Sequence, residues 1–134
     1  MAFPSKVDWG VGEVLTSAGV NTLAGNVNLL AYLPTNAQTG TSYTLALTDV
    51  AYIVEMNNAS SNTLTVPPNS SVAFPTGTQL IVLQTGAGQT TIAAGSGVTI
   101  NSSGSKLKLT GQWSAATLIK RSTNSWVAVG DLSA

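Results

Sequence analysis

The feature that most constrains the fold is a series of short apolar runs separated by small polar residues between residues 78 and 130. The runs are rich in β-branched residues, and glycine, serine or asparagine separates most of them. Segments of about four to eight residues between turn residues are typical of strands, whereas helices need longer periodic segments. The pattern therefore predicts consecutive short antiparallel strands, at 78–85, 90–94, 98–100, 106–110, 115–119 and 126–129.

Similar runs precede this region. Residues 43–48 alternate apolar and polar side chains, and further runs occupy 52–56 and 63–66. The Gly-rich segments 86–89 and 95–97 are typical of hairpin turns. The sequence thus predicts a mainly β domain at 38–134, an antiparallel sandwich or barrel of about nine short strands.

Residues 1–37 have a different pattern and are predicted to form an anchoring arm and a short helix. Val20, Leu23, Val27 and Leu30 recur at spacings of three and four, which places them on one face of a helix ending before Pro34. This stripe could hold identical helices together around an axis in an oligomer. It could equally pack on the chain's own β domain.

The first fourteen residues are not periodic, but they carry large apolar side chains. Phe3 and Trp9, with Val14 after them, are candidate anchors on a partner surface. Docking on the same chain is an equally good interpretation.

Charged residues make up only 7% of the 134 residues, and the net charge is zero. An average soluble chain has about 25%, and low charge leaves a protein prone to association. The composition therefore favours a surface covered by copies of the chain or by a host assembly, although a monomer with a hydroxyl-rich surface stays possible.

The residue inventory argues against most enzymatic chemistry. Histidine and cysteine are absent, which excludes thiol and imidazole catalysis and zinc sites built on those ligands. Asp49 and Glu55 are predicted to be a turn residue and a solvated strand residue, not a catalytic pair. We expect no enzyme, no metal and no cofactor.

Other ligand classes have weak support. The cations Lys106, Lys108, Lys120 and Arg121 are too sparse for a nucleic-acid site and are expected at solvated strand ends or against a neighbouring copy. No run is long enough to cross a membrane. Trp113 is the aromatic residue expected to be exposed, and it could stack on a host-surface glycan.

Two segments resemble known proteins. Residues 9–21, which read WGVGEVLTSAGVN, are similar to the opening "W-x-x-GEVLTAADLN" of many tailed-bacteriophage virion proteins, with Gly19 as a departure. The second covers most of the β domain and comprises Tyr43–Leu45, Thr48–Asp49, Asn57–Ser60, Thr63–Pro67, Phe74–Thr78, Gly86–Gln89, Gly97–Thr99 and Trp126–Leu132. It resembles a β module of phage tail fibres, head fibres and capsid decoration proteins.

The resemblance implies a structural protein of the virion, commonly a homotrimer, made in the host cytoplasm. Its partners would be copies of itself and the major capsid protein or another virion protein. A short chain with one arm and one β body favours capsid decoration or a head fibre over a tail component.

Overall fold

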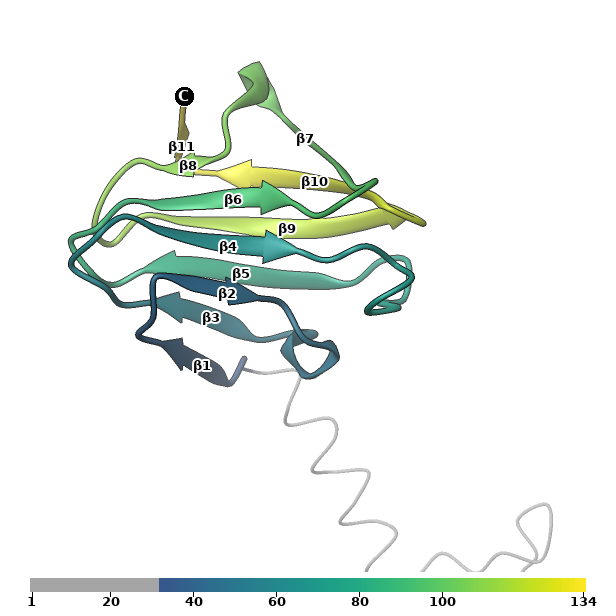
Figure 1. Ribbon diagram of the computed structural model, residues 1–134, viewed down its shortest axis with the longest axis horizontal. Coiled ribbons are helices and arrows are strands. Elements are labelled where there is room, and N and C mark those ends of the chain that lie inside the picture. The colour runs from purple at the N-terminus through teal and green to yellow at the C-terminus, as the bar shows by residue number, and fades with distance from the viewer. Residues whose placement is uncertain (1–31) are drawn as a thin grey trace, which may run out of the picture. The chain divides into compact units, whose positions relative to one another are not determined.

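Residues 32–134 are described by the computed structural model, and their predicted fold class is confirmed: eleven strands form two sheets (Figure 1). We name the six-stranded sheet A and the five-stranded sheet B. Sheet A has the order β1-β3-β5-β9-β10-β7. Its strands are β1 Thr35–Gln38, β3 Ile53–Met56, β5 Gln79–Gln84, β7 Thr99–Ser102, β9 Ala115–Ser122 and β10 Ser125–Gly130.

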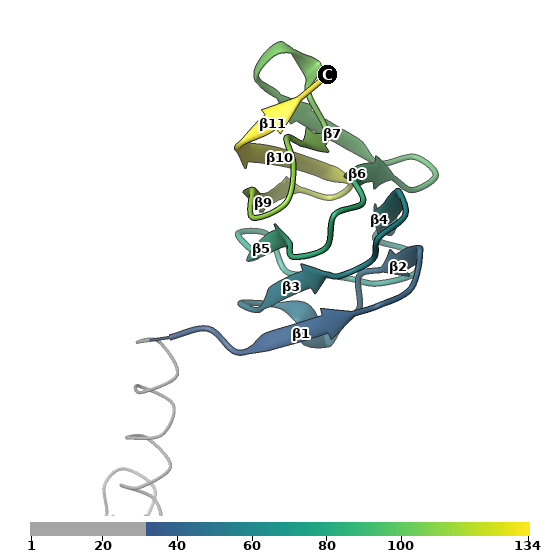
Figure 2. The same ribbon diagram turned by 90° about the vertical axis from the view of Figure 1, so that its left-hand side faces the viewer.

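Sheet B has the order β11-β8-β6-β4-β2. Its strands are β2 Ser42–Thr44, β4 Asn62–Val66, β6 Thr90–Ala94, β8 Lys108–Leu109 and β11 Leu132–Ser133. Figure 2 shows β3, β5 and β9 in one layer and β2, β4 and β6 in the other. The apolar core lies between these layers.

The chain changes sheet after every strand from β1 to β8, so it winds around the core in successive coils. Strands that are neighbours in a sheet then belong to successive coils and run parallel, as in β1-β3-β5 and β2-β4-β6. Parallel neighbours need a crossover of about a dozen residues or more, and here the strand in the opposite sheet supplies it. Among the strands of residues 32–134, a tight antiparallel hairpin occurs only at β9-β10, in the C-terminal part.

The predicted antiparallel pairing is therefore wrong for five of the nine strand pairs in residues 32–134. The hairpin predictions at 86–89 and 95–97 are wrong for the same reason, because each segment carries the chain from one sheet to the other. Alternation of apolar and polar residues specifies which face is buried, but it is the same in parallel and antiparallel strands.

Two local predictions also differ from the structure. Residues 35–37 were assigned to the N-terminal arm and short helix, but Thr35–Gln38 form β1, which pairs with β3. The β unit is therefore Pro34–Ala134 and begins before the predicted boundary at residue 38. Leu47 was expected in a half-buried strand, but it lies in the 3-10 turn η1 (Leu47–Asp49) and is exposed. A second such turn, η2, spans Ser103–Ser105.

The core is filled by alternate residues of both sheets. Trp126 is its largest fully buried side chain and meets Phe74 edge to face, with ring centroids 5.5 Å apart. Phe74 lies in the connection between β4 and β5, so this contact ties that connection to β10. The other fully buried side chains include Val54, Met56, Leu64, Val66, Leu80, Val82, Ile92, Leu109 and Leu118.

The predicted N-terminal features fall outside the described residues. These are the anchors Phe3, Trp9 and Val14, and the helical stripe Val20, Leu23, Val27 and Leu30. Within residues 32–134, no helix has the length and hydrophobicity to cross a bilayer.

Candidate interaction surfaces

The outer side of sheet A is lined by large aliphatic side chains. Ile81 on β5 lies between the fully buried Leu80 and Val82, so it faces away from the core. The same alternation places similar residues outward on β3, β9 and β10. We call this surface the apolar face and define it by Ile53, Ile81, Leu83, Ile119, Val127 and Val129.

The pairing register makes the apolar face continuous. Ile53 lies beside Ile81, and Ile119 lies beside Val127. Thr117 lies between Ile81 and Val129 in the next strands. Most of these side chains are half-buried by one another, whereas Val129 is 47% exposed. Directly paired side chains on one side of a sheet touch, so these residues present a single surface.

The outer side of sheet B is chemically different. Its outward positions carry hydroxyl side chains on every strand of the parallel part: Ser42, Thr44, Thr63, Thr65 and Thr91. Hydroxyl groups retain their hydrogen bonds to water, so this side is suited to solvent. The two sheets of one sandwich thus differ in what their outer sides can contact.

Two opposite charges lie at the ends of the apolar face. Glu55 on β3 pairs in register with Leu83, and Leu83 pairs with Ala115 at the start of β9. Arg121 is exposed near the other end of β9. At about 3.3 Å per residue, roughly 20 Å separates Arg121 from the level of Glu55 along the strand direction. The two side chains of one copy therefore cannot reach each other.

Trp113, predicted to be exposed, is 69% exposed. Its backbone φ of 73° places it in the left-handed region, which is a genuine outlier for a bulky residue. Its backbone N donates to the carbonyl of Gln84 at 2.7 Å, which fixes the turn. Strain of this kind is often retained where a side chain must be displayed.

Trp113 belongs to the connection between β8 and β9, and the connections β1-β2, β3-β4, β5-β6 and β8-β9 lie together on the left of Figure 1. The turns are joined through backbone carbonyls: Asn58 donates to Thr39 at 2.7 Å, and Gln112 donates to Thr85 at 3.0 Å. We call this surface the turn face and define it by residues 39–41, 57–61, 85–89 and 110–114. It presents hydroxyl and amide groups beside one exposed indole.

A buried polar cluster occupies the core at the first coil. Asp49 is fully buried and accepts hydrogen bonds from the Tyr43 hydroxyl at 2.6 Å, the Asn36 amide at 2.7 Å and the Ala46 backbone N at 2.8 Å. Asp49 is thus a structural acceptor that ties β1 and β2 to η1. Glu55 lies on the outer side of sheet A, so the two carboxylates are not brought together.

Burial, reinforced by the hydrogen bond to Asp49, raises the pKa of Tyr43 to about 12. The free phenol titrates near pH 10. The fold therefore favours the protonated phenol, and its stabilisation is complete below pH 10 and is lost as the pH rises towards 12. We expect the urea midpoint to fall across this window in the wild type and to fall less in Tyr43→Phe. Tyr52→Phe is the control for removing a phenol elsewhere, and parallel curves for wild type and Tyr43→Phe would contradict the assignment.

Lys120 was expected at a solvated strand end or against a neighbouring copy, but the structure places it elsewhere. It is buried, and its ammonium donates to the side-chain oxygen of Asn69 at 2.6 Å and to the carbonyl of Phe74 at 2.7 Å. These bonds fix the connection between β4 and β5. Among the four late cations, Lys106, Lys108 and Arg121 are exposed.

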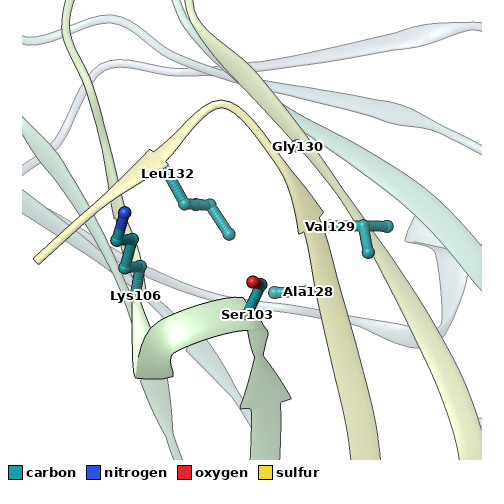
Figure 3. A pocket seen from close by; sticks show the side chains of 6 residues that line it. All are labelled: Ser103, Lys106, Ala128, Val129, Gly130 and Leu132. Atoms are coloured by element: carbon teal, nitrogen blue, oxygen red, sulfur yellow. The ribbon is translucent and has the colours of Figure 1, made fainter.

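A hollow of about 220 Å³ lies between η2 and the β10-β11 turn (Figure 3). Its lining includes Ser103, Lys106, Ala128 and Leu132, whereas the Val129 side chain points away from the hollow. Lys106 is the one titratable side chain in this lining, so the hollow lacks a partner group for acid–base catalysis. In the described part of the chain, no cluster of three or more histidine, cysteine, aspartate or glutamate residues could hold a metal ion.

The exposure of Trp113 was predicted from the sequence, but the apolar face was not. The signal was present in β5, where Leu80, Ile81, Val82 and Leu83 are consecutive apolar residues. A strand with one solvated side alternates, whereas a continuous apolar run indicates that both sides are covered. No protein-family model matches the sequence, and no curated protein matches it.

Proposed function

We propose that this chain is a structural protein of a phage virion, a homotrimer that decorates the capsid surface. It attaches to the major capsid protein or another virion protein through residues 1–14, with Phe3, Trp9 and Val14 as anchors. The stripe Val20, Leu23, Val27 and Leu30 contributes to the trimer axis. The role is adhesive and involves no catalysis, cofactor or nucleic acid.

The observation that supports the proposal best is the apolar face, on a chain with 7% charged residues. A sheet that is apolar on both sides is suited to contact with other protein on its outer side. The resemblance of residues 9–21 and of the β module to phage virion proteins supports the same role. Neither supporting observation requires a reaction centre.

The mechanism is burial repeated many times. Each apolar contact contributes about 25 cal/mol per Å² of buried area before the costs of association. Three arms on one trimer would bind three neighbouring lattice sites, and the second and third contacts form at high effective concentration. Weak individual contacts can then give durable decoration.

The test is attachment to purified virions of the phage that encodes this chain. We expect the full chain to co-sediment with particles and to have the mass of a trimer by light scattering. A variant lacking residues 1–14 should keep the trimer mass but lose attachment, because the anchors are removed. Particle binding by the shortened variant would contradict the anchor assignment, and a monomer at micromolar concentration would contradict the trimer.

A tail appendage or glycan-binding module is the second candidate, and the display of Trp113 beside the polar turn face favours it. An exposed indole stacks on sugar rings, while amide and hydroxyl groups bind their hydroxyls. Under this alternative, Trp113→Ala weakens binding to host cells or a glycan array while particle attachment survives. Regular capsid density in micrographs together with an empty glycan array would decide for decoration.

A further inference from the structure

We propose that the apolar face of sheet A is a self-association surface, which packs against the same face of another copy of this chain. In this contact Glu55 of one copy meets Arg121 of the other. The inference rests on the trimer of the proposed function and goes beyond it: a contact of one face with the same face of another copy is two-fold, so it pairs copies of two different trimers through a surface within the β unit. It does not depend on where the assembly is attached.

The first argument is the contrast between two sheets of the same molecule. Ile81, at the centre of the apolar face, has Ile53 on one side and Thr117 on the other. The outward positions of sheet B pair Thr63 with Thr91 and Thr65 with the small Ala93. Both sheets share one core, so packing inside the sandwich does not explain why only sheet A is aliphatic outside. Contact with another protein surface does, because it removes aliphatic area from water.

The second argument is charge complementarity, which selects a copy of this chain as the partner. Glu55 and Arg121 lie at opposite ends of the apolar face, roughly 20 Å apart at 3.3 Å per residue. When two such faces are turned against each other, the acidic end of one can lie over the basic end of the other. The surface is thus self-complementary: aliphatic in the centre, with one charge of each sign at its ends.

Cysteine cross-linking tests the contact directly, because the chain has no cysteine of its own. We expect the full-length double variant Glu55→Cys/Arg121→Cys to form a disulfide between copies under mild oxidation. A disulfide within one copy is excluded by geometry, since the two Cα atoms must lie within about 7 Å. The single variants Glu55→Cys and Arg121→Cys should remain uncross-linked.

The matched control is Thr44→Cys/Lys108→Cys on the outer side of sheet B. These two positions are also exposed and lie on strands that are not neighbours, so they too can link only between copies. We expect this control to remain uncross-linked. Failure of Glu55→Cys/Arg121→Cys to cross-link, or equal cross-linking of both double variants, would overturn the proposal.

A second variant tests the centre of the face in solution. Ile81→Lys should raise the dissociation constant of this pairing in the full-length protein by about 30-fold or more, as expected for a hot spot. Thr65→Lys, at an outward position of sheet B, should leave the oligomer mass unchanged. Circular dichroism and a melting curve establish that both variants fold, and the cross-linking result stands if Ile81→Lys does not fold. An unchanged mass for folded Ile81→Lys would overturn the proposal.

The outcomes separate this inference from the proposed function. If the protein attaches to virions but Glu55→Cys/Arg121→Cys does not cross-link, the proposed function is supported and the self-association surface is contradicted. If the double variant cross-links but the protein attaches to no virion component, the self-association surface is supported and the proposed function is contradicted. Wild-type protein that gains no mass beyond the trimer at tens of micromolar would overturn the self-association surface.

Discussion

Replacing Gly88 with alanine is expected to destabilise the protein by about 3 kcal/mol, at the upper end of the range for overpacking. A Cβ at this position would clash with the carbonyl oxygen and the carbonyl carbon of Ser60. Both are backbone atoms of the adjacent turn, so no side chain can rotate away to make room. Urea unfolding followed by circular dichroism measures the loss.

Gly111→Ala is the matched control. A Cβ there would have no heavy atom within 4 Å, so the free energy of unfolding should change by about 0.5 kcal/mol or less. The comparison also tests the coil arrangement, because Gly88 is crowded by the stacking of its turn on the turn at 57–61. Its backbone N donates to the carbonyl of Asn58 at 2.9 Å. Equal stability of the two variants would contradict this stacking.

Trp126→Ala is expected to cost about 3–5 kcal/mol, the usual range for removing a large aromatic side chain from a core. Trp126 is 1% exposed and packs edge to face on Phe74, at an interplanar angle of 88°. Its removal would leave a cavity between the sheets and would also free the connection that carries Phe74. The free energy of unfolding should therefore fall, and proteolysis near residues 67–77 should become faster.

Trp113→Ala provides the control for the loss of an indole. Trp113 is 69% exposed, so its truncation should change the free energy of unfolding by about 0.5 kcal/mol or less. A large loss for Trp113→Ala, or a small one for Trp126→Ala, would contradict the assignment of one tryptophan to the surface and the other to the core. The same Trp113 variant serves the glycan experiment, so one protein separates stability from binding.

Trp113 and Trp126 show which properties of a single residue can be predicted from its local sequence. Trp126 begins the run 126–129, which was predicted to be a strand, and the structure places its side chain in the core. Trp113 follows Gly111 and Gln112 in a turn segment and was expected outside. Its left-handed backbone could not be predicted, because it arises from the bond between its backbone N and the carbonyl of Gln84 on another strand.

The apolar face could not be predicted from the sequence. The run Leu80–Leu83 was recognised as a strand, but its outward residues were not recognised as a surface. An outward aliphatic residue forms part of a continuous surface only when its neighbours in register are also aliphatic, as with Ile53 beside Ile81 and Ile119 beside Val127. Those neighbours are far apart in the chain.

By itself, the sequence determined that this protein is mainly β, where most of its strands lie and that Trp113 is exposed. These properties depend on residue type and on a period of two, which are local. The tertiary structure alone decided that most neighbouring strands are parallel, that Lys120 and Asp49 are buried, and that sheet A is aliphatic on its outer side. Strand direction, burial of a polar group and the composition of a surface all depend on which distant segments become neighbours. Alternation along one strand does not specify those neighbours, because it depends on the residues of that strand alone.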